Sequence, residues 1–202
     1  MFTLFGKKPA GAIKYYGLSD WWLTTFNTAE KKRIVEVYGP GGVTEGDILS
    51  MSGSATGYLS TMAGWFKNEQ DRHIAYKLLE KAEALASSAP VLDRHFLFQA
   101  KNEIYYRFRD IDDFALERAI KACEQQIAIS TEAADAFKKE YPDQELPGHV
   151  GYIDLAIIRE KEGRLEDAIR LCEGALAQNW SGDWEKRIER YKSKLERLKN
   201  RN

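Results

Sequence analysis

The stretch from Leu146 to Trp180, LPGHVGYIDLAIIREKEGRLEDAIRLCEGALAQNW, predicts two amphipathic helices in succession. Its apolar and small residues recur at the i, i+3, i+4, i+7 spacing that places them on one helix face. The first run comprises Tyr152, Leu155, Ala156 and Ile158, and the second comprises Leu165, Ala168, Ile169, Cys172, Ala175 and Leu176. Gly163 lies between the runs, and glycine readily adopts the left-handed conformation that ends a helix. We therefore expect an antiparallel hairpin in which the two apolar stripes face each other.

This hairpin resembles the tetratricopeptide repeat, whose period is about 34 residues. The residues that carry the resemblance are Tyr152, Leu155, Ala156, Gly163, Ala168, Cys172, Ala175 and Trp180. The sequence departs from the repeat at four positions: Ala156 is usually Gly, Arg159 is usually Tyr, Cys172 is usually a large aromatic residue and Trp180 is usually Pro. The resemblance implies an all-α fold in which antiparallel helical hairpins stack as a short solenoid.

Similar patterns recur along most of the chain. We expect helical hairpins at 54–88, 90–130 and 147–179, followed by a helix at 182–199 that caps the stack. The segment ERAIKACE from Glu117 matches EDAIRLCE from Glu166 at an offset of 49 residues (166 − 117). This offset exceeds the repeat period, and a longer turn at 110–113 with an extra helix near Phe137 accounts for the surplus. Residues 54–202 are thus predicted to form one TPR-like domain.

Residues 1–53 differ from the rest because they concentrate aromatic side chains. We expect this N-terminal segment to pack on the solenoid and cover its open end, since a terminal repeat needs a cap. An aromatic surface that docks a partner is the alternative. Within the segment, Asn27 and Glu30 have the spacing of a capping box, which predicts a helix that begins just after Asn27.

Composition restricts the classes of function. The formal net charge of −1 gives no overall electrostatic attraction to nucleic acid. No run approaches about 18 apolar residues and the N-terminus does not read as a secretory signal, so no membrane span is expected. The chain has only two cysteines, Cys123 and Cys172, which are expected to be buried free thiols in a reducing compartment. The sequence therefore predicts a cytoplasmic protein.

The sequence contains only weak candidates for a catalytic or metal-binding site. The triplet DRH occurs twice and ends at His73 and at His95. Residues two apart on a helix point to different faces, so neither triplet can hold a metal by itself. A small metal-dependent enzyme that uses both histidines is an alternative interpretation. The favoured one is a non-enzyme that has no cofactor, no metal and no catalytic residues.

The predicted function is that of an adaptor or scaffold that binds a protein or peptide on the concave face of the solenoid. Leu97, Ala100 and Ile104 are expected to be buried. The predicted partner-binding residues, which would face the groove, are His95, Phe98, Asn102, Tyr105, Tyr106, Ile153, Ile157, Glu160 and Lys161. The other possibility is that the N-terminal segment or the helix near Phe137 fills this groove.

The C-terminal helix suggests a further alternative, an accessory protein of nucleic acids. Lysine and arginine outnumber acidic residues in this helix, and Arg190, Lys194 and Arg197 are the candidate contacts. Cations are also favoured near a helix C-terminus by the helix dipole, which accounts for part of the excess.

Overall fold

The structure is a computed structural model that describes residues 8–38 and 42–200. It confirms the all-α class: helices make up 71% of the described residues, which contain no β-strand. The chain divides into two compact units, Met1–Asp93 and Arg94–Asn202. Each unit has its own arrangement of helices.

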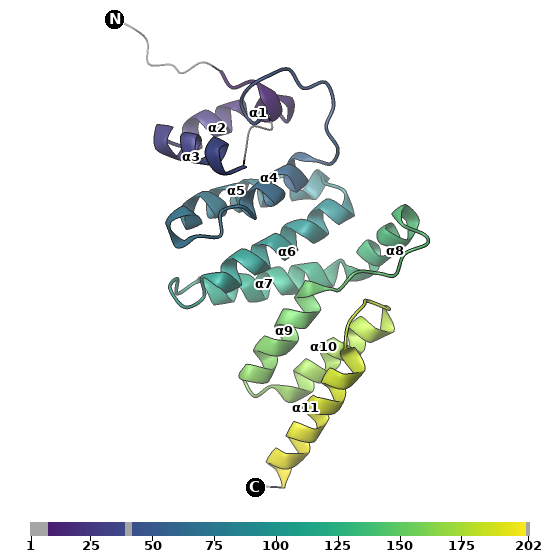
Figure 1. The fold of residues 1–202 in the computed structure, drawn as a ribbon. Coiled ribbons are helices and arrows are strands. Elements are labelled where there is room, and N and C mark those ends of the chain that lie inside the picture. The colour runs from purple at the N-terminus through teal and green to yellow at the C-terminus, as the bar shows by residue number, and fades with distance from the viewer. Residues whose placement is uncertain (1–7, 39–41, 201–202) are drawn as a thin grey trace, which may run out of the picture. The chain divides into compact units, whose positions relative to one another are not determined.

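The described residues of the first unit form five complete α-helices, which are labelled in Figure 1. They are α1 (Gly11–Tyr15), α2 (Ser19–Thr25), α3 (Thr28–Tyr38), α4 (Ala55–Ala63) and α5 (Arg72–Ala84). Short 3-10 helices cover Glu69–Asp71 and Ala86–Ser88. Helices α4 and α5, which lie within residues 54–88, pack against each other.

The loop after α3 folds back onto the start of α1. Backbone N–H groups of Ala12 and Ile13 donate to the carbonyl groups of Gly42 and Val43 at 2.8 and 3.0 Å. Gly11 has a φ of +57°, and a Cβ atom at this position would lie 1.9 Å from the oxygen of Gly42. Only glycine allows the two segments to approach so closely.

Helix α3 contacts α5 through Glu30 and Lys77. Residues 1–7 and 39–41 of the N-terminal segment lie outside the described part, and the capping of a solenoid by residues 1–53 stays a prediction. The predicted capping box is present, because the amide of Asn27 donates to Glu30 Oε2 at 2.8 Å and the amide of Glu30 donates to Asn27 Oδ1 at 2.9 Å. Glu30 also accepts from Lys77 Nζ on α5 at 2.6 Å. Burial alone would raise the pKa of Glu30, but these bonds outweigh it and the pKa is lowered.

The boundary between the compact units lies after Asp93, whereas the sequence placed the domain boundary at residue 53. Asp93 belongs to the first turn of α6 (Val91–Arg107). Its Oδ2 atom accepts a hydrogen bond from the amide of Ser54, the N-cap residue of α4, at 2.7 Å. This contact ties the start of α6 to the first hairpin.

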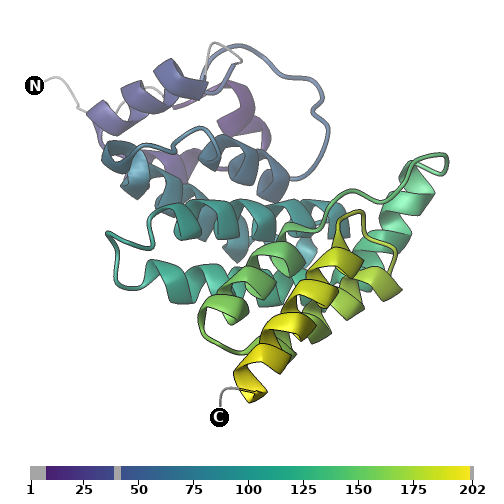
Figure 2. The ribbon, with the colours of Figure 1, turned by 60° about the horizontal axis from the view of Figure 1, so that its bottom comes forward.

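The second unit contains the rest of α6 and five more α-helices. They are α7 (Ala115–Ala128), α8 (Ser130–Glu140), α9 (Val150–Lys161), α10 (Leu165–Ala177) and α11 (Trp184–Lys199). Helices α6 and α7 are antiparallel, since His95 contacts Gln126 and Tyr105 contacts Arg118. Helices α9, α10 and α11 lie side by side (Figures 1 and 2), and α7 packs on α9. Helices α6 and α7 lie within residues 90–130, α9 and α10 within 147–179, and α11 within 182–199.

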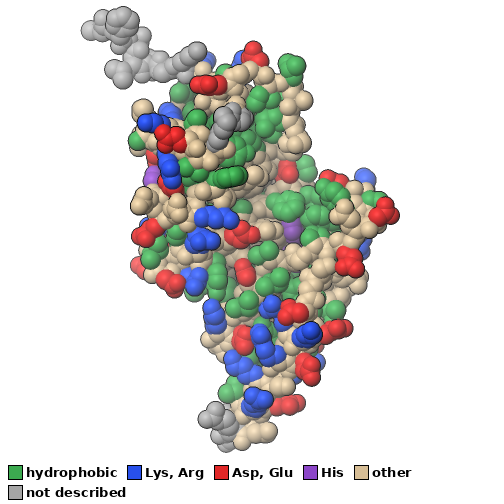
Figure 3. Space-filling view, in the orientation of Figure 1, with side chains coloured by type: hydrophobic (Ala, Val, Ile, Leu, Met, Phe, Trp, Pro, Cys, Tyr) green, Lys and Arg blue, Asp and Glu red, His purple; other side chains and the backbone are tan. Residues whose placement is uncertain are grey.

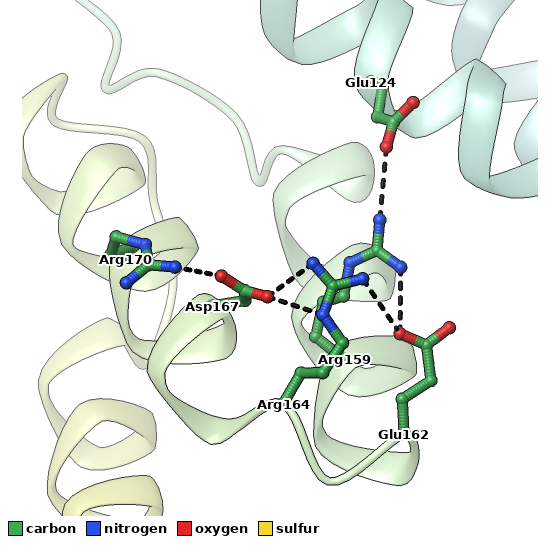
Figure 4. Close-up of polar contacts among 6 residues, drawn as sticks. All are labelled: Glu124, Arg159, Glu162, Arg164, Asp167 and Arg170. Carbon is green, nitrogen blue, oxygen red and sulfur yellow. Dashed lines mark hydrogen bonds and ion pairs between the residues drawn. The ribbon is translucent and has the colours of Figure 1, made fainter.

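The turn between α9 and α10 forms as the sequence predicted. Gly163 has a φ of +77°, and the amide of Arg164 donates to the carbonyl of Arg159 at 2.8 Å. Figure 4 shows the ion pairs that surround this turn. Arg159 pairs with Glu124 of α7 at 3.2 Å and with Glu162 at 2.9 Å. The arginine that departs from the repeat pattern therefore links α9 to α7.

Small residues let the helices of the second unit approach closely. Ala168 is fully buried, as are Cys123 and Cys172, which are free thiols. A Cβ atom at Gly151, in the first turn of α9, would lie 2.7 Å from Gln126 Oε1 and 3.1 Å from the carbonyl oxygen of Cys123. The expectation of buried cysteines is confirmed.

Candidate functional site

Four of the nine predicted partner-binding residues are buried, so the expectation that they face an open groove is corrected. His95, Phe98, Asn102 and Tyr105 are between 0 and 8% exposed. Leu97 and Ile104 on another face of α6 are buried as predicted, whereas Ala100 is only half-buried. Helix α6 is thus covered on more sides than a groove-lining helix would be.

The other five predicted residues remain accessible. Tyr106, Ile153, Ile157 and Glu160 are half-buried, and Lys161 is exposed. Lys161 Nζ donates to the hydroxyl oxygen of Tyr106 at 3.0 Å and lies 5.7 Å from the centroid of its ring. This contact brings the C-terminal ends of α6 and α9 together.

Helix α11 adds cations to the same region. Arg190 Nη2 lies 3.1 Å from Glu160 Oε2, and Lys194 Nζ lies 3.4 Å from Glu160 Oε1. We call this surface the α6/α9/α11 face. It comprises Tyr106, Ile153, Ile157, Glu160, Lys161, Arg190 and Lys194. In the alternative interpretation from the sequence, Arg190 and Lys194 were candidate contacts for nucleic acid. The sequence did not indicate that α11 lies beside the end of α9.

A polar link joins α6 to α9 close to this face. Asn102 is fully buried, and its Nδ2 atom donates to Asp154 Oδ2 at 2.6 Å. Asn102 Oδ1 has no hydrogen-bond partner among the residues described. Burial raises the pKa of Asp154, and the hydrogen bond from Asn102 opposes this shift. The pair fixes the relative register of α6 and α9.

A second cluster joins two buried histidines to aromatic rings. His95 of α6 stacks on Trp180 with ring centroids 5.5 Å apart and planes 9° apart. His149, the N-cap residue of α9, meets Trp180 nearly edge-on at 4.7 Å. The two imidazole centroids are 5.1 Å apart, and Phe137 of α8 lies 5.5 Å from His95. The cluster therefore connects three helices with the loop after α10.

Hydrogen bonds fix the tautomer of each histidine. Gln126 Oε1 accepts from the amide of Gly151 at 2.8 Å, so Gln126 Nε2 is the donor to His95 Nε2 at 3.2 Å. His149 Nδ1 accepts from the amide of Tyr152 at 3.3 Å and so caps the N-terminus of α9. The protons therefore reside on His95 Nδ1 and His149 Nε2. Neither atom has a hydrogen-bond partner within the described segments.

Burial keeps both imidazoles neutral near pH 7. It lowers the pKa of His95 to about 4 and, together with the proximity of His95, lowers the pKa of His149 to about 3. Burial also raises the pKa of Cys123 to about 12 and that of Cys172 to about 11, so both thiols stay protonated.

The two DRH triplets lie in different environments. His73 belongs to α5 in the first unit, where its exposed side chain lies 3.1 Å from Glu30 Oε1. His95 belongs to the buried cluster of the second unit. Across residues 8–38 and 42–200, no three His, Cys, Asp or Glu side chains form a group that could hold a metal ion.

Comparison with protein-family models, curated proteins and solved structures finds no significant match. Within the described segments, each helix is too short or too polar to cross a membrane. Function is therefore inferred from the geometry of this chain.

Proposed function

We propose that this protein is a non-catalytic adaptor or scaffold of the cytoplasm that binds a protein or peptide partner on the α6/α9/α11 face, and that its hairpins form a TPR-like solenoid. One observation carries the proposal. The contacts of Lys161 with Tyr106, and of Glu160 with Arg190 and Lys194, gather accessible side chains from three helices on one surface. Such a surface can engage several side chains of a partner at once.

The chemistry of this face suits an extended or helical peptide. Ile153 and Ile157 are one helical turn apart, and both are half-buried, so they can bury apolar side chains of a partner. The charged residues around them would orient the partner and add specificity, which is the usual role of a polar rim. Tyr106 offers an aromatic surface of the kind that is enriched at binding hot spots.

Co-purification with matched variants tests the proposal. The tagged full-length protein would be recovered from native lysate, and bound proteins would be identified by mass spectrometry. Ile157→Arg should remove the partner, because it places a charge within the apolar part of the face. Leu116→Arg is the control, since Leu116 is 39% exposed on α7 and lies outside this face. Retention of the same proteins by folded Ile157→Arg would refute the proposal.

Nucleic-acid binding through α11 receives less support. Arg187 pairs with Asp183 at 2.5 Å, while Arg190 and Lys194 pair with Glu160. These carboxylates already neutralise much of the charge that phosphates would require. The enzyme interpretation is also disfavoured, because His95 is buried and neutral.

A further inference from the structure

Five aromatic side chains of the first unit form a continuous row. Tyr15 ends α1 and Tyr16 is its C-cap residue; their ring centroids are 5.0 Å apart, and the ring of Tyr16 lies 5.2 Å from that of Tyr58 in α4. Tyr38 of α3 then contacts Tyr58 at 5.8 Å and Trp65 at 6.2 Å. We call these residues the aromatic row. Figure 3 shows hydrophobic side chains gathered over α1 and α4.

Both ends of the aromatic row are open to solvent. Tyr15 is 42% exposed and Trp65 is 59% exposed. Tyr16 and Tyr38 are half-buried, and Tyr58 is 8% exposed. Large aromatic side chains are normally buried or used for contacts, so a row with exposed ends is a candidate docking surface.

The row also contains an unused polar group. The hydroxyl of Tyr58 is buried and has no hydrogen-bond partner within residues 8–38 and 42–200. A buried hydroxyl without a partner is unfavourable. Burial raises the pKa of Tyr58, so the hydroxyl retains its proton.

The charge around the aromatic row favours a cationic partner. Asp93 is close enough to Tyr16 to raise the pKa of that phenol, although burial is the larger cause. The carboxylate of Asp93 accepts the amide of Ser54, and the described residues place no cation on it. None of the five rings has a lysine or arginine over its face among the residues described. The faces of the rings and the carboxylate are thus both sites of negative potential.

From this geometry we infer that the aromatic row, together with Asp93, docks an arginine-bearing peptide segment of a partner protein. A guanidinium group can stack flat on a tyrosine or tryptophan ring and can also form paired hydrogen bonds with a carboxylate. This surface lies within the first unit and does not depend on the α6/α9/α11 face.

Fluorescence anisotropy with a labelled peptide of repeated Arg-Gly-Gly triplets tests the inference. The same peptide with citrulline in place of arginine has nearly the same shape but no charge. We expect the arginine peptide to bind the full-length protein and the citrulline peptide to bind at least about fivefold more weakly. Binding should also weaken with added salt.

Two variants locate the binding. Trp65→Ala removes the most exposed ring, and Asp93→Asn removes the charge while keeping an oxygen that can accept from Ser54. Each should weaken binding about fivefold or more. Phe96→Ala, at a 47% exposed ring on α6, is the control and should bind normally. Circular dichroism would verify that all variants are folded.

Several results would overturn the inference. These are equal affinity for the citrulline peptide, unchanged affinity in folded Trp65→Ala and Asp93→Asn, or no binding of the arginine peptide at all. Tighter binding of a proline-rich peptide would also refute it, because the rings would then recognise another chemistry. Ile157→Arg should not alter arginine-peptide binding, so failure of the proposed function can be told apart from failure of this inference.

Discussion

The contacts of Trp180 explain why this chain has tryptophan at a position where the tetratricopeptide repeat usually has proline. Its side chain is 2% exposed, and its Nε1 atom donates to Gln178 Oε1 at 2.9 Å. Its ring contacts both buried imidazoles, and its carbonyl accepts from Trp184 Nε1 at 2.5 Å. Proline at this position would supply neither the ring nor the backbone N–H, which donates to the carbonyl of Ala175 at 3.1 Å.

We therefore expect Trp180→Ala to lower the free energy of unfolding by about 3–5 kcal/mol, because it opens a large cavity between α6, α8 and α9. Urea denaturation followed by circular dichroism measures this change. Trp65→Ala is the matched control, since Trp65 is 59% exposed and its loss should cost about 0.5 kcal/mol or less. Equal unfolding midpoints for the two variants would show that Trp180 does not hold the cluster together.

At the scale of single elements, the helix–turn–helix of α9 and α10 follows closely from local sequence. Gly163 ends the first helix, and His149 accepts a hydrogen bond at its start. The length of each helix follows from the apolar periodicity, since a helix can be packed only where it presents an apolar face. The packing of α10 between α9 and α11 then buries Ala168 completely.

Ala168→Trp tests this packing. A large ring cannot fit where two helices approach closely, so the substitution should lower the free energy of unfolding by about 1–3 kcal/mol or more. Thermal melting of the full-length protein measures the effect as a lower Tm. Arg170→Trp, at an exposed position of the same helix, is the control and should melt close to the wild type. A neutral result for Ala168→Trp would mean that α9 and α10 do not pack as described.

At the scale of the whole molecule, the histidine cluster makes the stability of the second unit sensitive to acid. His95 and His149 have folded-state pKa values of about 4 and about 3, below the value near 6.5 of an unfolded chain. Their neutral forms are therefore favoured by folding. Their contribution is fully present above about pH 6.5, and it is lost as the pH falls from there towards 4 and 3.

Between pH 6.5 and 5, we expect each histidine to lower the free energy of unfolding by roughly 1 kcal/mol per pH unit. Denaturant titrations at several pH values would measure this slope. His95→Leu should reduce the slope by about half, because one of the two buried imidazoles is then absent. Identical slopes for the wild type and folded His95→Leu would contradict the assignment of a buried neutral imidazole.

Contacts between residues far apart in the sequence could not be predicted from local patterns. Glu30 and Lys77 are 47 positions apart, yet their ion pair holds the N-terminal helices on α5. Asp93 and Ser54 are 39 positions apart, and their hydrogen bond places the start of α6 with the first unit. The residues next to each of these side chains do not indicate which distant residue it will contact. A charged or polar side chain has many possible partners in a chain of this length.

Local sequence patterns were enough to predict the all-α class, the capping box at Asn27, the turn at Gly163 and the burial of both cysteines. These features depend on periodicity and on the conformational preferences of single residues, which act over a few neighbouring positions. Only the tertiary structure decided that His95, Phe98, Asn102 and Tyr105 are buried while Tyr106 and Lys161 stay accessible. The physical reason is that an aromatic or polar side chain on a helix can face either solvent or a neighbouring helix, and long-range packing selects between them.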